Sequence, residues 1–115
     1  MTARDIQKQD GQWTRAKGFD GFAPIGPLVT DEIDPARLAI RTRLHGKIKQ
    51  ASSTANQIWP VGELIEFITA CMTLEPGDIV TTGTPSGVGP MQPGDDVEVS
   101  VEGIGVLKNP VIAAR

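Results

Sequence analysis

The sequence predicts a mostly β fold, with antiparallel or mixed strands and one amphipathic helix packed on the sheet. Glycine and proline supply 13 and 9 of the 115 residues, more than a helical bundle tolerates, which indicates strands joined by shaped turns. Several short segments alternate apolar and polar side chains, as half-buried strands do. One stretch, residues 60–72, instead repeats its apolar side chains at helical spacing. These three observations predict the fold class.

The first twenty residues combine cationic, amide and glycine residues. Arg4 and Gln7 are three apart, so on a helical turn they share one face and could reach the same ligand. Further on, alternation predicts an extended segment that places Arg15 and Lys17 on one face beside Trp13. A guanidinium fork and a point charge together suit planar anionic groups. The alternative interpretation is a solvated basic face on an ordinary surface strand.

Residues 38–44 and 47–50 predict a β-hairpin. Apolar side chains alternate with arginines over the first segment, which is typical of a half-buried strand. His45 and Gly46 stand where a two-residue turn would join the two strands. His45 is the only histidine in the chain. Because no carboxylate cluster neighbours it in the sequence, we interpret it as a turn residue and not as a catalytic base.

Residues 60–72 predict the single helix of the chain. Pro60 suits a first helical turn, and Glu63 and Glu66 lie toward the start, where the helix dipole favours anions. The apolar stripe consists of Val61, Leu64, Ile65, Ile68 and Met72. We expect this stripe to cover the sheet, since core packing is the usual role of such a face.

A short β-branched segment, residues 79–82, predicts a strand that ends in the glycine-rich loop 83–89. Gly83 and two further glycines let backbone amides approach a ligand, and the Thr84 hydroxyl can donate beside them. No Gly-Lys-Ser/Thr follows, so this loop is not a phosphate-binding motif of the Walker type. The alternative is a tight bend at a sheet corner. Alternation then predicts two last strands, over 96–101 and 104–108.

Composition and charge exclude several classes of function. A formal net charge of −3 argues against a general nucleic-acid surface. No apolar stretch approaches the roughly 18 residues that a membrane span needs. Cys71 stands alone in an apolar run, so we expect a buried small apolar side chain and a reducing, cytoplasmic setting. Asp31, Glu32 and Asp34 indicate a solvated acidic turn, and we expect no metal ligands within this chain.

Several motifs in this order resemble the C-terminal half of the fumarylacetoacetate hydrolase superfamily. They are TARD-x-Q, GQWTRAKGFDGFAPIGP, HGK followed by a glutamine, LEPGDIVTTGTPSGVGP and GDDVEVSVEGIGVLKNPV. The match runs essentially from end to end. It implies a rolled β-sandwich topology, and a single domain over residues 1–115 that forms the C-terminal part of a catalytic domain. The family's metal-ligand segment would lie upstream of the residues given.

The resemblance also implies a function. Such enzymes act on small dicarbonyl or dicarboxylate compounds, by carbon–carbon bond hydrolysis or decarboxylation through an enolate stabilised by Mg or Mn. In such enzymes the metal is held by a Glu-x-Glu pair and an aspartate, and the resemblance implies that all three would lie upstream of Met1. An isomerase of the 2-hydroxyhepta-2,4-diene-1,7-dioate type is an alternative. A second alternative is a non-catalytic assembly module that retains the scaffold.

The resemblance assigns roles residue by residue. Lys17 would neutralise charge that develops on the substrate, while Arg4 and Gln7 would orient its carboxylate. Thr84 corresponds to a substrate-contacting hydroxyl. The remaining residues expected at the substrate opening are Gly83, Arg15, Gln50 and Thr54. We expect a small-molecule carboxylate as substrate, and as partner either a second copy of the chain in a homodimer or a complementary segment of the same family.

Overall fold

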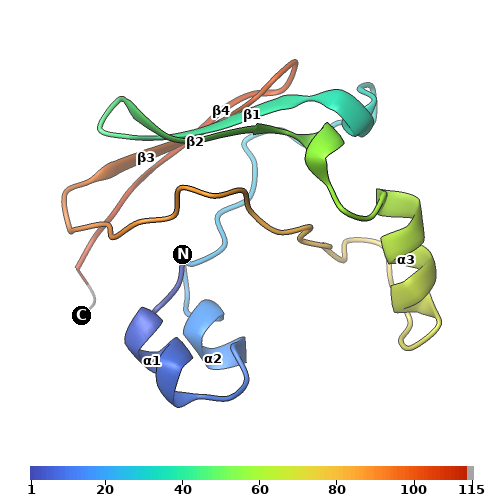
Figure 1. The fold of residues 1–115 in the computed structure, drawn as a ribbon, viewed down its shortest axis with the longest axis horizontal. Coiled ribbons are helices and arrows are strands. Elements are labelled where there is room, and N and C mark those ends of the chain that lie inside the picture. Colours follow the sequence, from blue (N-terminus) through green and yellow to red (C-terminus); the bar gives the residue numbers. More distant parts are fainter. Residues whose placement is uncertain (114–115) are drawn as a thin grey trace.

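The computed structural model describes residues 1–113 and is built around a four-stranded antiparallel sheet (Figure 1). The strands stand in the order β2-β1-β3-β4, and every neighbouring pair is antiparallel. Their bounds are Ala39–Leu44 for β1, Lys47–Ser53 for β2, Asp96–Val101 for β3 and Gly105–Pro110 for β4. The mostly β fold class is confirmed. Four of the five predicted strands are present, with β2 extending three residues further than predicted.

The β1–β2 hairpin turns at His45 and Gly46, as predicted. Both residues have positive φ, 48° and 72°, which matches the right-handed twist of the strands that they join. Between Thr42 and Arg43 the register shifts, so that a bulge interrupts the pairing of β1 with β2. β1 pairs with β2 on one side and with β3 on the other, so the β1–β2 and β3–β4 hairpins form one sheet.

The strand predicted over residues 79–82 is wrong. This segment is irregular and belongs to the long coil that runs from α3 to β3 (Figure 1). Its β-branched residues favour extended backbone, but a strand also needs a neighbouring backbone to bond with. None of the strands within residues 1–113 pairs with it. Because no strand in this part of the chain lies beside it to form hydrogen bonds, this segment remains coil despite its β propensity.

The extended segment predicted around Arg15 is also wrong. The chain begins with two short helices, α1 over Arg4–Gln9 and α2 over Thr14–Lys17. In α2 the Lys17 amide donates to the Trp13 carbonyl at 3.0 Å, which is a helical hydrogen bond. At 100° per residue, positions 15 and 17 point in nearly opposite directions. Arg15 and Lys17 therefore do not share a face.

The predicted helix exists as α3, Val61–Thr69, but it does not pack on the sheet. In Figure 1 it stands at the far right, joined to the rest of the molecule by coil at both ends. Its stripe residues are only partly covered, and Cys71 just beyond it is exposed, contrary to the prediction. Two 3-10 helices complete the elements, η1 at Pro35–Arg37 and η2 at Thr54–Asn56.

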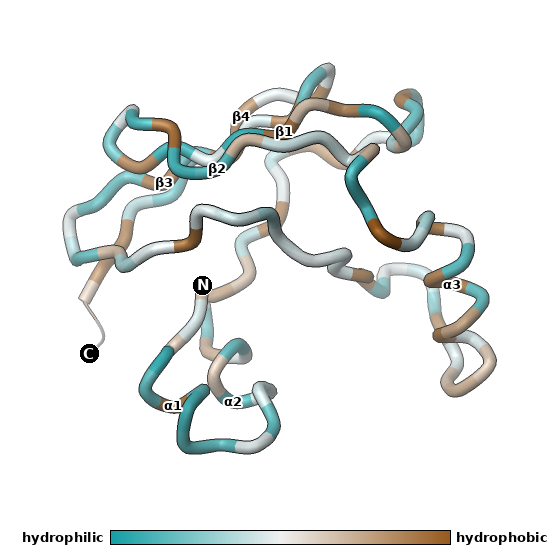
Figure 2. Tube along the Cα trace, in the orientation of Figure 1, coloured by the Kyte–Doolittle hydropathy of each residue, from teal (hydrophilic) through white to brown (hydrophobic). Residues whose placement is uncertain are grey.

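The core is thin. Within residues 1–113 the apolar side chains classed as buried are Ala16 and Val111. Figure 2 shows apolar residues spread along the sheet, α3 and the connecting coil, and not gathered in one place. No helix in the described part of the chain is long and apolar enough to cross a membrane.

Candidate anion-binding site

The two N-terminal helices form a small hairpin that gathers polar side chains. The Ala3 amide donates to the Ala16 carbonyl at 3.0 Å, which ties the start of α1 to α2. Ala16 is fully buried between them, and a larger side chain there would separate the two helices. Two hydrogen-bonded pairs, Arg4 with Gln7 and Lys17 with Thr2, lie on this hairpin or just before it, and their four side chains are here called the Arg4–Lys17 cluster.

The cations of this cluster have neutral partners. An Arg4 Nη1–H donates to Gln7 Oε1 at 2.6 Å, so the predicted shared face is confirmed. The Lys17 ammonium donates to Thr2 Oγ1 at 3.0 Å and lies 5.7 Å from the centroid of the Trp13 ring. Within residues 1–113 neither cation forms an ion pair with a carboxylate. Two uncompensated positive charges on adjacent helices suit an anionic ligand.

Arg15 has a different setting. Its Nε and Nη2 donate to the two carboxylate oxygens of Asp10 at 2.8 and 2.7 Å. This bidentate contact holds the pKa of Asp10 below its usual value, chiefly through the hydrogen bonds from Arg15. The pair joins α2 to the turn after α1. Its guanidinium fork is thus occupied by a carboxylate of the chain itself, unlike that of Arg4.

A second polar arrangement joins β2 to the glycine-rich loop. Gln50 Nε2 donates to Thr84 Oγ1 at 2.8 Å and to the Pro85 carbonyl at 2.7 Å. Because a carbonyl only accepts hydrogen bonds, the nitrogen side of the Gln50 amide must face the loop. Thr84 Oγ1 therefore accepts from Gln50, and its own hydrogen is left to donate elsewhere. The structure thus brings together two predicted site residues that are 34 positions apart.

Gly87 lets the loop lie directly on β2. A β-carbon at this position would collide with the Lys49 carbonyl oxygen, and its φ of 106° is one that only glycine adopts readily. Gly83, at φ 104°, bends the chain just before Thr84. Thr54 has another role, since its Oγ1 accepts from the Leu38 amide at 2.8 Å, at the start of β1. Two contacts therefore hold the loop against β2, the hydrogen bonds from Gln50 and the close approach of Gly87 to Lys49.

The two arrangements lie on different parts of the chain. In the view of Figure 1 the coil that runs from α3 to β3 passes between the sheet and the α1–α2 pair. That Lys17 and Thr84 contact one substrate stays a prediction. The predicted substrate roles of Gly83, Arg15, Gln50 and Thr54 also stay predictions.

A metal ion is not accommodated by the described residues alone. Among residues 1–113 there is no group of three or more histidine, cysteine, aspartate or glutamate side chains that could hold one. The metal implied by the resemblance would need ligands from elsewhere.

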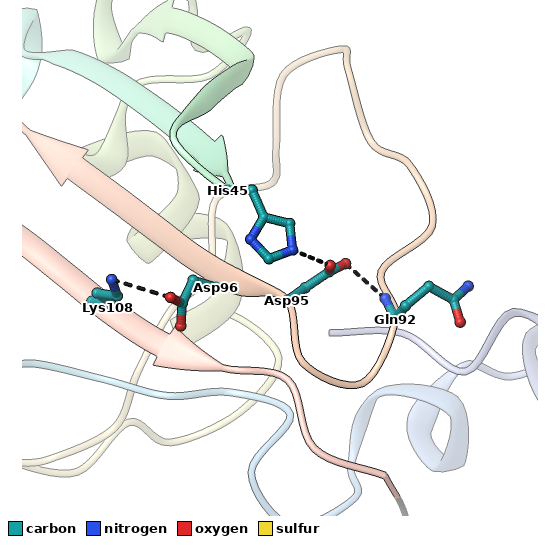
Figure 3. Close-up of polar contacts among 5 residues, drawn as sticks. All are labelled: His45, Gln92, Asp95, Asp96 and Lys108. Carbon is teal, nitrogen blue, oxygen red and sulfur yellow. Dashed lines mark hydrogen bonds and ion pairs between the residues drawn. The ribbon is translucent and has the colours of Figure 1, made fainter.

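Sequence reasoning missed one contact of the histidine. His45 Nε2 lies 2.6 Å from Asp95 Oδ1, and Asp95 Oδ2 accepts from the Gln92 amide at 2.7 Å (Figure 3). The pKa of Asp95 lies below its usual value, chiefly because of the hydrogen bond from the Gln92 backbone amide and secondly because of the contact with His45. Lys108 and Asp96 form a separate ion pair at 3.3 Å. His45 is a turn residue as predicted, and the sequence did not indicate its carboxylate partner because 50 positions separate the two residues.

Comparison with known proteins places this geometry in context. The family model described as "Fumarylacetoacetate (FAA) hydrolase C-terminal" matches residues 1–112. The chain is 54% identical to a solved 2-hydroxyhepta-2,4-diene-1,7-dioate isomerase from Mycobacterium marinum, with a TM-score of 0.94 over 96% of this chain and 44% of that one. A fumarylacetoacetate hydrolase from Exiguobacterium antarcticum is 43% identical, with a TM-score of 0.93 over 98% of this chain and 44% of that one.

A curated relative shows the same relation. The oxaloacetate tautomerase YisK of Bacillus subtilis is 38% identical over 121 residues, covering 96% of this chain and 40% of its own length. The chain spans about half the length of the curated relatives that it matches.

Proposed function

The chain belongs to the fumarylacetoacetate hydrolase family, and from this premise we propose that it supplies the substrate-binding part of an enzyme that acts on small dicarbonyl or dicarboxylate compounds through an enolate. The observation that carries the proposal is the Arg4–Lys17 cluster. Its two cations have hydroxyl and amide partners and no carboxylate partner within residues 1–113. A dianionic substrate would supply the missing negative charge.

The chemistry of the proposed site follows from where charge develops. When a bond next to a carbonyl breaks, or a proton leaves that position, negative charge moves onto the carbonyl oxygen. The Lys17 ammonium, held by Thr2, would stabilise that charge as a fixed cation. Arg4, whose side chain is oriented by Gln7, would bind a substrate carboxylate through its remaining N–H groups. The Thr84 hydroxyl, with its hydrogen free, would donate to a further substrate oxygen.

Two reaction outcomes share this enolate. Hydrolysis or decarboxylation breaks a carbon–carbon bond, whereas isomerisation only relocates a proton and a double bond. The second outcome is a distinct candidate, because an isomerase and a tautomerase are among the relatives of this chain. Product analysis with acylpyruvate, oxaloacetate and a hydroxydienedioate would separate the two. Cleavage products support the first, and an isomerised substrate with its carbon skeleton intact supports the second.

We also propose that the site is completed by a complementary segment of the same family fold. The chain matches only 44–46% of the length of several relatives, and the described residues offer no metal site. Mg or Mn, if bound in the assembled enzyme, would take its carboxylate ligands from that segment. It would supply Lewis-acid stabilisation of the substrate oxygens.

The test of the proposal is a substitution of Lys17 in the assembled protein. We would join this chain to the part of the Mycobacterium marinum relative that it does not match, and measure turnover with Mg or Mn present. Lys17→Met should lower kcat by roughly 10²–10³-fold, because one fixed charge that stabilises the transition state is lost. The control is Lys8→Met, since Lys8 is exposed on α1 and outside the cluster.

Two results would reject the proposal. Equal turnover of the two lysine variants would exclude the proposed charge-stabilising role of Lys17. A well-folded assembly that neither turns over these substrates nor binds oxalate, an enolate mimic, would favour the alternative of a non-catalytic assembly module.

A further inference from the structure

The chain leaves much more surface open than a compact protein of its size. Its accessible surface is 9146 Å², whereas a folded monomer of its mass, 12.2 kDa, exposes about 6,000 Å². Its radius of gyration is 15.3 Å, against about 13 Å for a compact chain of this length. Roughly 3,000 Å² that folded proteins normally cover is therefore open.

Large apolar side chains are exposed on this surface, and five of them lie on α3 or within three residues of it. We define the α3 patch as Ile58, Trp59, Val61, Phe67 and Met72, all of which are exposed. Ile58 is 87% and Phe67 73% exposed, values that are unusual for side chains of this size. Aromatic, methionine and isoleucine side chains grouped in this way are typical of an interaction surface.

The position of α3 is a property of the fold. Solved relatives superpose on 96–98% of this chain with TM-scores of 0.93–0.94, so the same separation of α3 from the sheet is kept in them. Those chains are more than twice as long, because this one covers 44% of each. α3 thus keeps its distance from this sheet in longer chains, whose additional polypeptide could lie beside it.

We infer that the α3 patch is the docking surface for the segment of the family fold that this chain does not match. The inference deepens the proposed function, since it names the surface through which the completing segment would attach. The segment must present an apolar face, because the patch offers almost no hydrogen-bonding groups of its own. In the relatives it makes up more than half of the chain.

A second copy of the chain fits the surface less well. Covering about 3,000 Å² on each of two copies would bury about 6,000 Å² in total, above the 2,000–5,000 Å² of most obligate dimers. Exposed large apolar side chains also occur just before α2, on β4 and on the coil after α3, including Trp13, Val106 and Ile79. One flat twofold contact would not reach all of these regions, whereas a segment that wraps around the chain would.

The experiment tests association without any substrate. The full chain is expressed with a tagged segment comprising the unmatched part of the Mycobacterium marinum relative. The two should co-purify at one to one, and the binding of the apolar dye ANS by the isolated chain should fall when the segment is added. Hydrogen exchange at residues 58–72 should slow in the complex.

Two variants localise the contact. Ile58→Asp lies outside any helix and is almost fully exposed, so it should leave the fold of the isolated chain intact. It should weaken association at least about tenfold, because a charge replaces an apolar side chain that becomes buried. Phe67→Asp is the second patch variant. The matched control is Glu66→Lys, a charge change at an exposed position of α3 that is not part of the patch, which should leave the dissociation constant within about twofold.

The possible results separate this inference from the proposed function. Absence of association, association insensitive to both patch variants, or a homodimer that Ile58→Asp dissociates would each overturn it. A patch-dependent complex without turnover or oxalate binding would instead reject the proposed function and leave the docking surface established.

Discussion

At the scale of single residues, two arginines of similar sequence context have different surroundings. Arg4 is held by a neutral amide, whereas the fork of Arg15 is occupied by the Asp10 carboxylate. The former can bind a substrate carboxylate without losing an existing ion pair. The latter would first have to give up its partner.

This difference predicts unequal effects on substrate affinity. In the assembled protein Arg4→Gln should raise KM by roughly 10–100-fold, the value of a hydrogen bond to a charged group. Arg15→Gln should change KM by less than about threefold, since an exposed ion pair contributes little. Steady-state kinetics of both variants checks this. Equal increases in KM would show that Arg15 also contacts substrate.

A second prediction concerns the contact of the glycine-rich loop with β2. Gly87→Ala should destabilise the assembled protein by more than Gly77→Ala. Both glycines have φ near +100°, but only at Gly87 would a β-carbon collide with backbone. The backbone strain common to both is about 1–2 kcal/mol, and the collision adds to it at Gly87. Urea denaturation gives the two unfolding free energies, and equal values would contradict the loop contact seen here.

At the scale of secondary structure elements, the sequence predicted those whose signal is local and long. The strands β1 and β3 and the helix α3 were found because alternation or helical spacing persists over six or more residues, whereas β2 and β4 were predicted over only four and five residues. The alternation from Trp13 to Lys17 was too short to distinguish strand from helix. Residues 79–82 have strand propensity but no partner, which a single sequence cannot show. The packing of α3 also depends on what lies beside it, and was predicted wrongly.

The same distinction applies to the candidate site. The Arg4–Gln7 contact follows from helical spacing. The pairing of Gln50 with Thr84 could be anticipated only through the family resemblance. Nothing in the sequence relates His45 to Asp95, because their proximity is created by the pairing of β1 with β3.

The hydrogen bonds of Asp95, first with the Gln92 backbone amide and then with His45, predict a pH dependence of stability at the junction of the two hairpins. Asp95 has a lower pKa in the folded protein than its ordinary value. Its ionised form therefore stabilises the fold above the unfolded pKa of about 3.9, and this contribution is lost as the pH falls through the folded pKa. The unfolding free energy of the assembled protein should thus decrease less steeply below pH 4 in Asp95→Asn than in the unmodified protein.

Denaturation at several pH values between 2 and 6 measures that slope. Asp20→Asn serves as the control, because the Asp20 carboxylate forms no hydrogen bond or ion pair within residues 1–113. If the unfolding free energy had the same pH dependence in the Asp95 and Asp20 variants, the hydrogen bonds of Asp95 would not contribute to the stability of the fold.

At the scale of the whole molecule, the thin core predicts weak cooperativity of the isolated chain. An unfolded chain of 12.2 kDa exposes about 17,700 Å², so folding to 9146 Å² buries about half of it, against about two thirds for a compact monomer. The urea m-value scales with the area exposed on unfolding. We expect the isolated chain to have an m-value about a quarter below that of compact proteins of equal length. A normal m-value would show that the chain closes on itself in solution.

The separation of α3 from the sheet has a consequence for the life of the chain in a cell. A polypeptide that displays isoleucine, tryptophan and phenylalanine in this way resembles the unfolded proteins that chaperones and degradative proteases recognise. Copies in which the α3 patch stays uncovered would be removed by them, so only copies with the patch covered would persist.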